Sequence, residues 1–222
     1  MNRISSITLG LLLSAFVAAD AAAQWNVARF GMERSRVYTT AGLDPAAVTT
    51  VGYGRVMQLR GHNFQVTGDL GVVAAGMDAR DYRARVGAQT SLLEWRSLHL
   101  TGSATFITRG TENSIYRGIN FGSDFTGTLG VYRPRWFASS EFGFDKAIVT
   151  HVTHTDWYRK NYYPDAKDGW YIDTGGTYHY GVAGGYALGR TELVGRFGLL
   201  RTERFNDLTS PAYASLGVGF GF

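Results

Sequence analysis

Residues Ala212–Phe222 read AYASLGVGFGF, and this stretch decides the fold class. Apolar side chains occupy every second position: Ala214, Leu216, Val218, Phe220 and Phe222. The positions between them hold a tyrosine, a serine and three glycines. A period of two residues is typical of a β-strand, in which successive side chains point to opposite faces. The stretch therefore predicts a strand with one continuous apolar face.

The same stretch resembles a known signature. Its alternating residues Leu216, Val218, Phe220 and Phe222 resemble the C-terminal strand of Gram-negative bacterial outer-membrane β-barrel proteins, where a final Phe is the usual insertion signal. The resemblance covers this strand alone and indicates a class rather than a particular protein. It implies a transmembrane antiparallel β-barrel, placed in outer-membrane lipid and lipopolysaccharide by the barrel-assembly machinery.

The other end of the chain predicts export. Met1–Ala23 contains Arg3, an apolar run from Ile7 to Ala19 and three alanines at 21–23, the pattern of a Sec-type signal peptide with its cleavage site. The apolar run is shorter than the roughly 20 residues that a membrane-spanning helix needs. We expect residues 1–23 to be a signal peptide, residues 24–222 to form one barrel domain, and the mature chain to begin at Gln24 or Trp25.

Composition agrees with a membrane barrel. The 222 residues include 29 glycines, 13 tyrosines and 13 phenylalanines. The chain has no cysteine, so if it is exported its stability must come from backbone pairing and packing rather than from disulfides. Mean hydropathy is close to zero, as expected when one strand face meets lipid and the other meets water. A net charge of +4, scattered along the chain, gives no indication of a nucleic-acid partner, although it favours anionic lipopolysaccharide.

Ten segments carry strand patterns. They are Trp25–Tyr38, Val48–Leu59, Asn63–Ala75, Tyr82–Leu92, Leu98–Arg109, Ile119–Tyr132, Trp136–Val149, Trp170–Leu188, Thr191–Arg201 and Ala212–Phe222. Most are long enough to cross a bilayer at the usual tilt, which needs about 9–11 residues. The fold class predicted is therefore all-β, an up-and-down antiparallel barrel of about ten strands.

Connection lengths support this prediction. Short connections at 60–62, 93–97, 133–135 and 189–190 alternate with longer ones at 39–47, 76–81, 110–118, 150–169 and 202–211. Short periplasmic turns that alternate with long outer loops are typical of outer-membrane barrels. An even strand number places both ends in the periplasm, with two aromatic girdles. Trp25, Trp95 and Trp136 belong to the inner girdle and Tyr38, Phe106 and Tyr178 to the outer one.

A soluble, lipocalin-like barrel is the structural alternative. Its apolar strand faces would point inward and its polar faces outward. The abundance of glycine, serine and threonine on the second face, together with Phe222, favours the membrane barrel.

The polar strand faces of a membrane barrel line its lumen. The side chains expected there are Arg29, Glu33, Asp69, Arg83, Arg85, His99, Asp124, Glu141, Asp145, His179, Glu192 and Arg196. Buried charges are tolerated when they are paired or hydrated, and the mixed signs favour ion pairs across the barrel. Ten strands enclose little more than the eight-stranded barrels that side chains can fill, so we expect a largely plugged lumen. A narrow, porin-like channel for small solutes is the alternative.

Segment 150–169, THVTHTDWYRKNYYPDAKDG, is the most distinctive loop. Three interpretations stay open: a metal or hydrolytic site of His151, His154 and Asp156, a surface loop packed on the rim, and a ligand loop. The ligand loop would use aromatic and basic side chains for sugars or anionic headgroups. Its residues are His151, His154, Asp156, Trp157, Tyr158, Arg159 and Lys160.

Catalytic motifs are weak. The aspartates and histidines needed by omptin-type proteases occur, but their spacing differs, and Ser139 and Ser140 lack the nearby histidine of outer-membrane lipid A deacylases. The sequence has no GxSxG, HExxH or phosphate-binding motif. We therefore expect a non-enzymatic surface or structural protein without cofactors, with a rim-sited outer-membrane hydrolase that uses the 150–169 loop as the second alternative.

Overall fold

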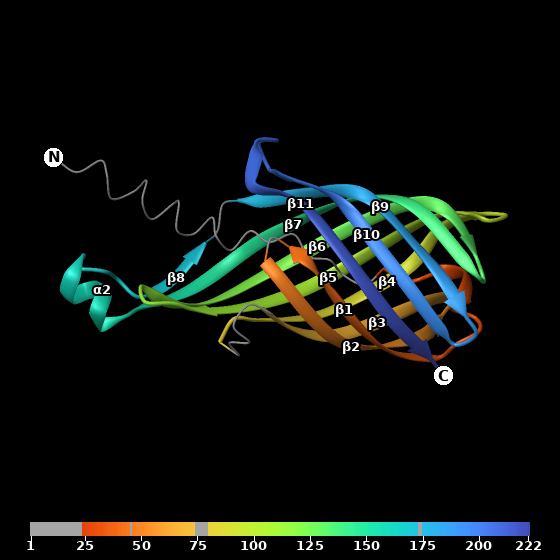
Figure 1. The fold of residues 1–222 in the computed structure, drawn as a ribbon, viewed down its shortest axis with the longest axis horizontal. Coiled ribbons are helices and arrows are strands. Elements are labelled where there is room, and N and C mark those ends of the chain that lie inside the picture. Colours follow the sequence, from red (N-terminus) through yellow and green to blue (C-terminus); the bar gives the residue numbers. More distant parts are fainter. Residues whose placement is uncertain (1–23, 45, 74–79, 173–174) are drawn as a thin grey trace.

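The computed structural model describes residues 24–222 except 45, 74–79 and 173–174. Ten strands form a closed antiparallel barrel, because β1 (Ser35–Asp44) pairs with β11 (Asp207–Gly221) and β6 (Tyr116–Arg133) pairs with β7 (Trp136–His154) (Figure 1). The other barrel strands are β2 (Ala46–Leu59), β3 (His62–Val73), β4 (Tyr82–Trp95), β5 (Leu98–Glu112), β9 (Gly176–Leu188) and β10 (Thr191–Thr202). Closure leaves no unpaired edge around the ring, which a sheet in hydrocarbon requires.

Three short elements in the described part of the chain lie outside the ring of barrel strands. The 3₁₀ helix η2 (Val27–Arg29) precedes the barrel, while α2 (Asp156–Asn161) and the strand β8 (Gly169–Ile172) lie between β7 and β9. β8 pairs with β7 alone, from Val149 opposite Ile172 to Val152 opposite Gly169. Within the described residues, no helix is long and apolar enough to span a membrane.

The barrel has two unlike ends. At the end that we call the short-turn end, two residues join β2 to β3, β4 to β5, β6 to β7 and β9 to β10 in each case. Arg60 and Gly61 both have positive φ, of 50° and 85°, as a two-residue hairpin turn of type I′ requires. The opposite end, called the long-loop end, carries α2 and the longer connections (Figure 1).

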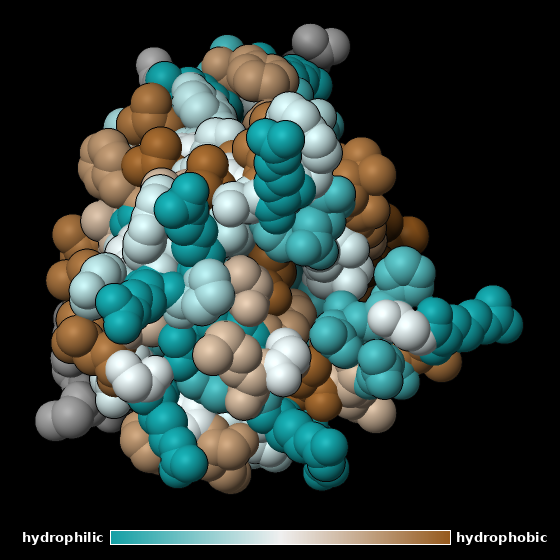
Figure 2. Space-filling view, turned by 90° about the vertical axis from the view of Figure 1, so that its right-hand side faces the viewer, coloured by the Kyte–Doolittle hydropathy of each residue, from teal (hydrophilic) through white to brown (hydrophobic). Residues whose placement is uncertain are grey.

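The distribution of polar and apolar side chains between the inside and the outside is inverted relative to a soluble barrel. Large apolar side chains such as Leu70, Val86, Phe106, Phe197 and Leu216 are exposed on the outside. Arginines, carboxylates, threonines and glutamines are buried inside. Figure 2 looks onto the short-turn end and shows hydrophilic side chains across its face with hydrophobic side chains around its margin. This is the arrangement of a membrane-spanning barrel, and it confirms the predicted fold class.

The first predicted strand is wrong. Trp25–Tyr38 was expected to cross the membrane, but β1 begins only at Ser35, and Trp25 is fully buried inside the barrel. Trp25 and Tyr38 therefore do not belong to aromatic girdles. A lumen buries apolar side chains as well as lipid does, so an alternating pattern does not distinguish the two surroundings. We call residues Gln24–Arg34 the N-terminal plug.

The prediction of a long loop at Thr39–Ala47 is also wrong. β1 continues to Asp44 and β2 begins at Ala46, with Leu43 opposite Ala47 in the ladder, so the two strands form a tight hairpin. Small and polar residues lie on both faces of this part of the two strands. Apolar alternation is therefore absent here, and the sequence pattern did not indicate that the strands continue.

Several strands extend beyond the barrel at the long-loop end. β5 and β6 pair as far as Glu112 opposite Arg117, and β6 and β7 as far as Tyr116 opposite His154. The expected loops at 110–118 and 150–169 are therefore partly strand. We call residues 110–121 and 147–172 the finger; α2 lies at its tip (Figure 1). A register shift at Phe121 and Gly122, opposite Val149 and Ala147, marks its base.

Candidate functional site

The N-terminal plug is attached to the short turns by hydrogen bonds. The Asn26 side chain caps η2 by accepting from the Ala28 backbone N–H at 3.1 Å, and its Nδ2 donates to the Arg133 carbonyl at 2.7 Å. Arg29 donates from Nη1 to the Pro134 carbonyl at 2.8 Å and from Nη2 to the Gly189 carbonyl at 2.7 Å. The plug is thereby fixed to two separate turns of the barrel.

Trp25 anchors the plug inside the lumen. Its ring lies edge-on to Tyr38 at 5.0 Å between centroids, and the Arg36 guanidinium lies 4.5 Å from the ring centroid. Its backbone N–H donates to Gln89 Oε1 at 3.2 Å, while Gln89 Nε2 donates to the Trp25 carbonyl at 3.3 Å. A side chain of β4 therefore holds the plug as a neighbouring strand would.

A charged layer surrounds the plug at the short-turn end. Glu33 pairs with Arg29 and, at 2.9 Å, with Arg36. Arg36 Nη1 lies 2.6 Å from Glu192 Oε2 on β10. Signs alternate along this chain of four buried side chains, so each carboxylate lies next to a guanidinium. Burial of these charges is tolerable only in such an arrangement.

The middle of the lumen contains two more buried ion pairs. Arg85 Nε donates to Asp69 Oδ1 at 2.6 Å, and the Tyr38 hydroxyl donates to Asp69 Oδ2 at 2.8 Å. Arg196 forms a bidentate pair with Glu141, at 3.0 Å from Nε and 2.9 Å from Nη2. Asp69 and Arg85 lie on the neighbouring strands β3 and β4, whereas Glu141 and Arg196 lie on β7 and β10, which are separated by β9. Both pairs therefore connect strands of the barrel wall from the inside.

A third acidic group lies close to these pairs. Asp124 Oδ2 is 2.7 Å from His179 Nε2, and the Thr126 hydroxyl donates to Asp124 Oδ1 at 2.7 Å. Between the plug and this layer, a small enclosed cavity has a volume of about 30 Å³ and is lined by Gln24, Asp69, Arg85, Thr126 and Arg196 among others. That space holds only one or a few water molecules.

Another pair closes the lumen toward the long-loop end. Arg109 on β5 pairs with Asp145 on β7 and donates from Nη1 to Asn120 Oδ1 at 3.1 Å. Asn120 Nδ2 donates to the Thr150 hydroxyl at 2.7 Å. Layers of polar side chains thus occupy the described lumen from the plug to the base of the finger.

The tip of the finger has its own polar cluster. Asp168 accepts from the His154 backbone N–H at 2.8 Å and pairs with Arg159 at 2.6 Å, while His154 Nδ1 lies 3.1 Å from the same carboxylate. The His154 backbone N–H, and then the Arg159 guanidinium, lower the pKa of Asp168 to about 2. The cluster fastens α2 to the end of β7.

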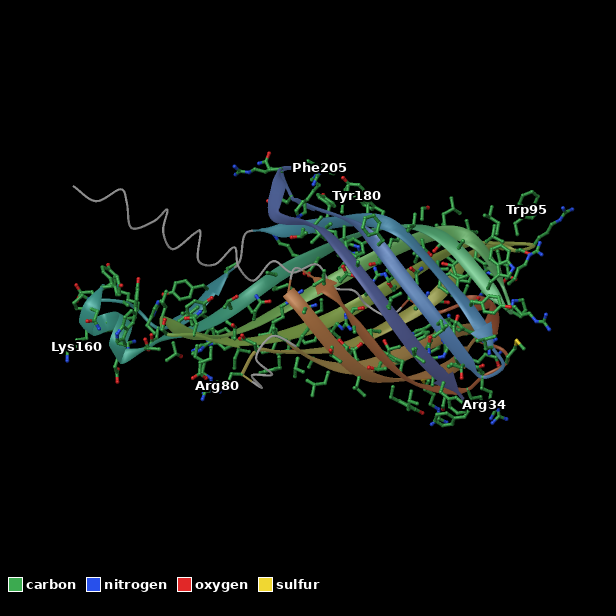
Figure 3. The ribbon with its side chains drawn as sticks, in the orientation of Figure 1. Arg34, Arg80, Trp95, Lys160, Tyr180 and Phe205 are labelled. Carbon is green, nitrogen blue, oxygen red and sulfur yellow. The ribbon has the colours of Figure 1, made fainter. Side chains whose placement is uncertain are left out.

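Aromatic side chains surround this cluster. Tyr158 stacks on His154 at 5.4 Å and on Tyr162 at 6.0 Å, and Trp157 lies 5.2 Å from Tyr162. Trp157, Tyr162 and Tyr163 are all about half exposed or more. Figure 3 places Lys160, on the same helix, at the far tip of the finger.

The structure places the predicted lumen residues as follows. Asp69, Arg85, Asp124, Glu141, Asp145, Glu192 and Arg196 lie inside the barrel on strands. Arg29 and Glu33 also lie inside, but they belong to the plug and not to a strand. Arg83 is only half-buried. The insertion-signal residues Leu216, Val218, Phe220 and Phe222 all point outward and are exposed.

The predicted ligand-loop residues do not gather at one point. His151, on the opposite face of β7 from His154, lies 4.8 Å from the Trp170 ring, and Asp156 is fully exposed at the start of α2. Trp157, Tyr158, Arg159 and Lys160 belong to α2. The structure does not bring His151, His154 and Asp156 together, and the described residues contain no other cluster that could hold a metal ion.

Sequence reasoning missed several interior residues. Arg36, Tyr38, Arg109 and Tyr213 are buried and take part in the lumen network, and Asp168, which sequence reasoning did not single out, pairs with His154 at the tip of the finger. Arg36 and Tyr38 alternate with the outward-facing Val37, so the true start of β1 would have revealed them. Nothing in the sequence pattern around Asp168 indicates its pairing with His154.

Comparisons with known proteins do not indicate a function for this chain. No family model matches the chain, and no curated protein matches it in sequence. Similar solved structures include Ail, the attachment invasion locus protein of Yersinia pestis, at 10% identity and a TM-score of 0.37 over 86% of this chain and 98% of that one. LpxR from Salmonella typhimurium has 10% identity and a TM-score of 0.37 over 93% and 80%. Acinetobacter baumannii outer membrane protein Omp33 has 8% and 0.35 over 86% and 98%. The function must be argued from the side chains of this chain.

Proposed function

We propose that the protein is a closed-lumen outer-membrane β-barrel of a Gram-negative bacterium whose function lies at the cell surface. Its role is non-enzymatic: the barrel anchors the finger and displays its tip outside the membrane. The observation that carries the proposal is the filled lumen, where the enclosed cavity between plug and middle ion pairs measures only about 30 Å³.

The interior supports this proposal energetically. Five of the lumen's carboxylates lie within ion-pairing distance of an arginine, and both members of each of those pairs are at most 10% exposed. A water-filled pore would leave such side chains hydrated and separable. Buried pairs are costly to break, because each partner left behind is an unpaired charge in a poorly hydrated space. The network therefore favours a permanent seal over a diffusion channel.

The exterior supports the outer membrane as the location. Aromatic rings form a connected group near the long-loop end, where the half-buried Phe121 stacks on the exposed Phe106 at 6.1 Å and on the exposed Trp170 at 6.2 Å. Trp95 and Trp136 are exposed at the short-turn end, as an aromatic girdle at the second interface requires. Arg80 and Lys160 lie at the long-loop end (Figure 3), where lipopolysaccharide presents its anionic groups.

Two measurements test the proposal. In planar bilayers, the purified protein should show no steady conductance; a stable open level would replace the surface role with transport. For orientation, the natural lack of cysteine allows single-site labelling. In intact cells, Lys160→Cys should react with a membrane-impermeant maleimide, and Arg96→Cys, in a short turn, should not. Labelling of Arg96→Cys alone would reverse the assigned orientation.

A further inference from the structure

Exposed arginines gather at the short-turn end of the barrel. Each of the four two-residue turns contains one, another is the last residue of β6, and another ends the plug directly before β1. They are Arg34, Arg60, Arg96, Arg133, Arg135 and Arg190, and all six are exposed. Within the described part of the chain, none of the six takes part in an ion pair.

The two ends of the barrel differ in how their exposed charges are balanced. The exposed anions described at the short-turn end are the side chain of Glu94 and the terminal carboxylate of Phe222 (Figure 1). At the long-loop end, exposed cations lie among carboxylates. Glu112, for example, lies 3.5 Å from Arg80 and 4.0 Å from Arg117. An excess of exposed positive charge therefore lies at the short-turn end.

The arginines of the short turns lie at the boundary of the apolar exterior. Each turn places one of them within two residues of an exposed apolar side chain: Leu59 before Arg60, Trp95 before Arg96, Trp136 after Arg135 and Leu188 before Arg190. The Arg96 guanidinium lies 5.6 Å from the ring centroid of Trp95, and the Arg133 guanidinium lies 5.8 Å from that of Trp136. Tryptophan rings at a membrane surface lie at the level of the lipid headgroups. Cations held against these rings are therefore at the depth of the lipid phosphates.

Arg55 favours lipid over a periplasmic polymer as the partner. It is exposed on the outward face of β2, between the exposed side chains of Tyr53 and Met57. An arginine on a lipid-facing wall extends its guanidinium along the wall to the nearer membrane surface. A headgroup phosphate at the rim reaches such a cation, whereas a polymer beneath the barrel contacts only the end face.

We propose that the short-turn end binds the anionic headgroups of phospholipids in the inner leaflet of the outer membrane, and that its exposed arginines contact their phosphates. This inference goes beyond the surface role proposed above and rests on the orientation given there, with the short turns in the periplasm. A guanidinium donates two parallel hydrogen bonds to a phosphate. Several cations on one rim favour a lipid of net negative charge, because a zwitterionic lipid compensates its phosphate with its own ammonium group.

Competition between two lipids tests the proposal. Protein purified from outer membranes is mixed with equal amounts of phosphatidylglycerol and phosphatidylcholine in detergent micelles, and the lipids that it retains are counted by native mass spectrometry. We expect the wild type to retain about threefold more phosphatidylglycerol, with a ratio that falls as the ammonium acetate concentration rises. Removal of the four turn cations should bring the ratio close to one. This variant carries Arg60→Gln, Arg96→Gln, Arg135→Gln and Arg190→Gln. Lysine at the same four positions keeps the charge and should retain most of the preference.

The matched control removes four exposed cations from the long-loop end and should keep the wild-type ratio. It carries Arg80→Gln, Arg117→Gln, Lys160→Gln and Lys167→Gln. If the short-turn variant does not fold, as judged by heat-modifiable gel migration, a double variant replaces it. Arg60→Gln with Arg190→Gln leaves the ring contacts of Trp95 and Trp136 intact and should still lower the ratio.

Three results would overturn the proposal. The first is equal retention of the two lipids by the wild type, and the second is an equal loss of preference in the short-turn and long-loop variants. The third is a lack of lipid preference together with arginine-dependent binding to purified peptidoglycan, which would make the cell wall the partner. Micelles have no leaflets, so the lipid ratio does not depend on orientation. Steady conductance of the wild-type barrel would contradict only the closed-lumen function.

Discussion

At the scale of single residues, the stability of the barrel depends on buried ion pairs, because removal of one partner leaves the other charge buried and unpaired. Arg85 is buried against Asp69, which also accepts from Tyr38. Arg85→Ala leaves the Asp69 carboxylate buried without its guanidinium, and such a loss typically costs about 3–5 kcal/mol. We expect a loss of this size in the free energy of unfolding, measured by urea titration in lipid vesicles.

The control for this prediction is the double variant Arg85→Ala with Asp69→Ala. It removes both charges, so it should destabilise the barrel less than Arg85→Ala alone. A double variant that is less stable than the single one by the full cost of Asp69→Ala would show that the two side chains act independently.

Asp168 gives a pH-dependent prediction at the tip of the finger. Its pKa is lowered from the ordinary 3.8 to about 2 by the His154 backbone N–H and the Arg159 guanidinium. The carboxylate therefore stabilises the tip fully above pH 3.8 and loses this effect as the pH falls through about 2. Pepsin cleavage within α2 should be slower for wild type than for Asp168→Asn at pH 4, and the two rates should converge toward pH 2. A constant ratio would contradict this role.

At the scale of elements, the cost of a charge on the outward face of a strand depends on how deep in the membrane it lies. Leu70 on β3 and Leu59 at the end of β2 are both exposed on the outside, but Leu59 lies next to the short turn at Arg60. An arginine in mid-membrane costs about 2–4 kcal/mol and near the interface about 0–1. Leu70→Arg should therefore destabilise the barrel in urea titrations, and Leu59→Arg should barely change it. Equal losses would mean that the membrane belt lies elsewhere.

An arginine on the lumen face should not be tolerated better than one on the outward face. A Cβ at Gly71 would lie 2.8 Å from the Thr50 hydroxyl oxygen, and Thr67 lines the small enclosed cavity. An arginine at either position would have no room. Tolerance inside this barrel is limited by volume and not by polarity.

The last strand closes the barrel through its backbone. Phe222 donates its backbone N–H to the Ser35 carbonyl at 2.9 Å, and Ser35 donates to the Phe222 carbonyl at 3.0 Å. Removal of Phe222 breaks this pair at the seam between β1 and β11 and removes an outward aromatic ring. We expect a clear fall in outer-membrane yield and in heat-modifiable gel migration. As a control, Phe205→Ala changes an exposed ring in a long-loop connection and should assemble normally.

Much of the element order could be predicted from period-two alternation, since each strand contacts lipid on one side. β3 and β10 were placed within a few residues of their observed bounds, whereas the plug was assigned to a strand and the predicted strand Trp170–Leu188 merged β8 with β9. Trp25 satisfies the alternating pattern because an apolar ring is equally stable against lipid and inside a packed lumen. The finger was missed for the opposite reason: outside the membrane, β6 and β7 pair through polar residues such as Thr150 and Thr153, which give no apolar alternation.

Ion-pair partners were less predictable than burial. The alternating pattern indicated that Asp69, Arg85, Glu141 and Arg196 face inward, but several pairings were compatible with it. Partner choice depends on shear and on strand order around the ring, since Glu141 and Arg196 lie on strands separated by β9. Only the three-dimensional register fixes which charges meet.

At the scale of the whole molecule, the lumen is sealed by successive layers. The plug with Arg36 and Glu192 closes the short-turn end, the pairs of Asp69 and Glu141 close the middle, and Arg109 with Asp145 closes the far side. The conductance of constrictions in series is limited by the narrowest of them. Loss of one layer should therefore leave the barrel closed.

Deletion of residues 24–33 tests this arrangement. The shortened chain, refolded from urea into detergent, loses the buried Trp25 and the contacts of Arg29 with two turns, so it should unfold at lower urea concentration than wild type. In planar bilayers it should still show no steady conductance, because Arg85, Arg196 and Arg109 remain paired in the layers beyond the plug. The same deletion combined with Asp69→Ala and Arg85→Ala widens the middle layer and should raise the conductance measurably. A stable channel from the plug deletion alone would show that the plug is the whole seal, and a gated pore would then replace the closed barrel.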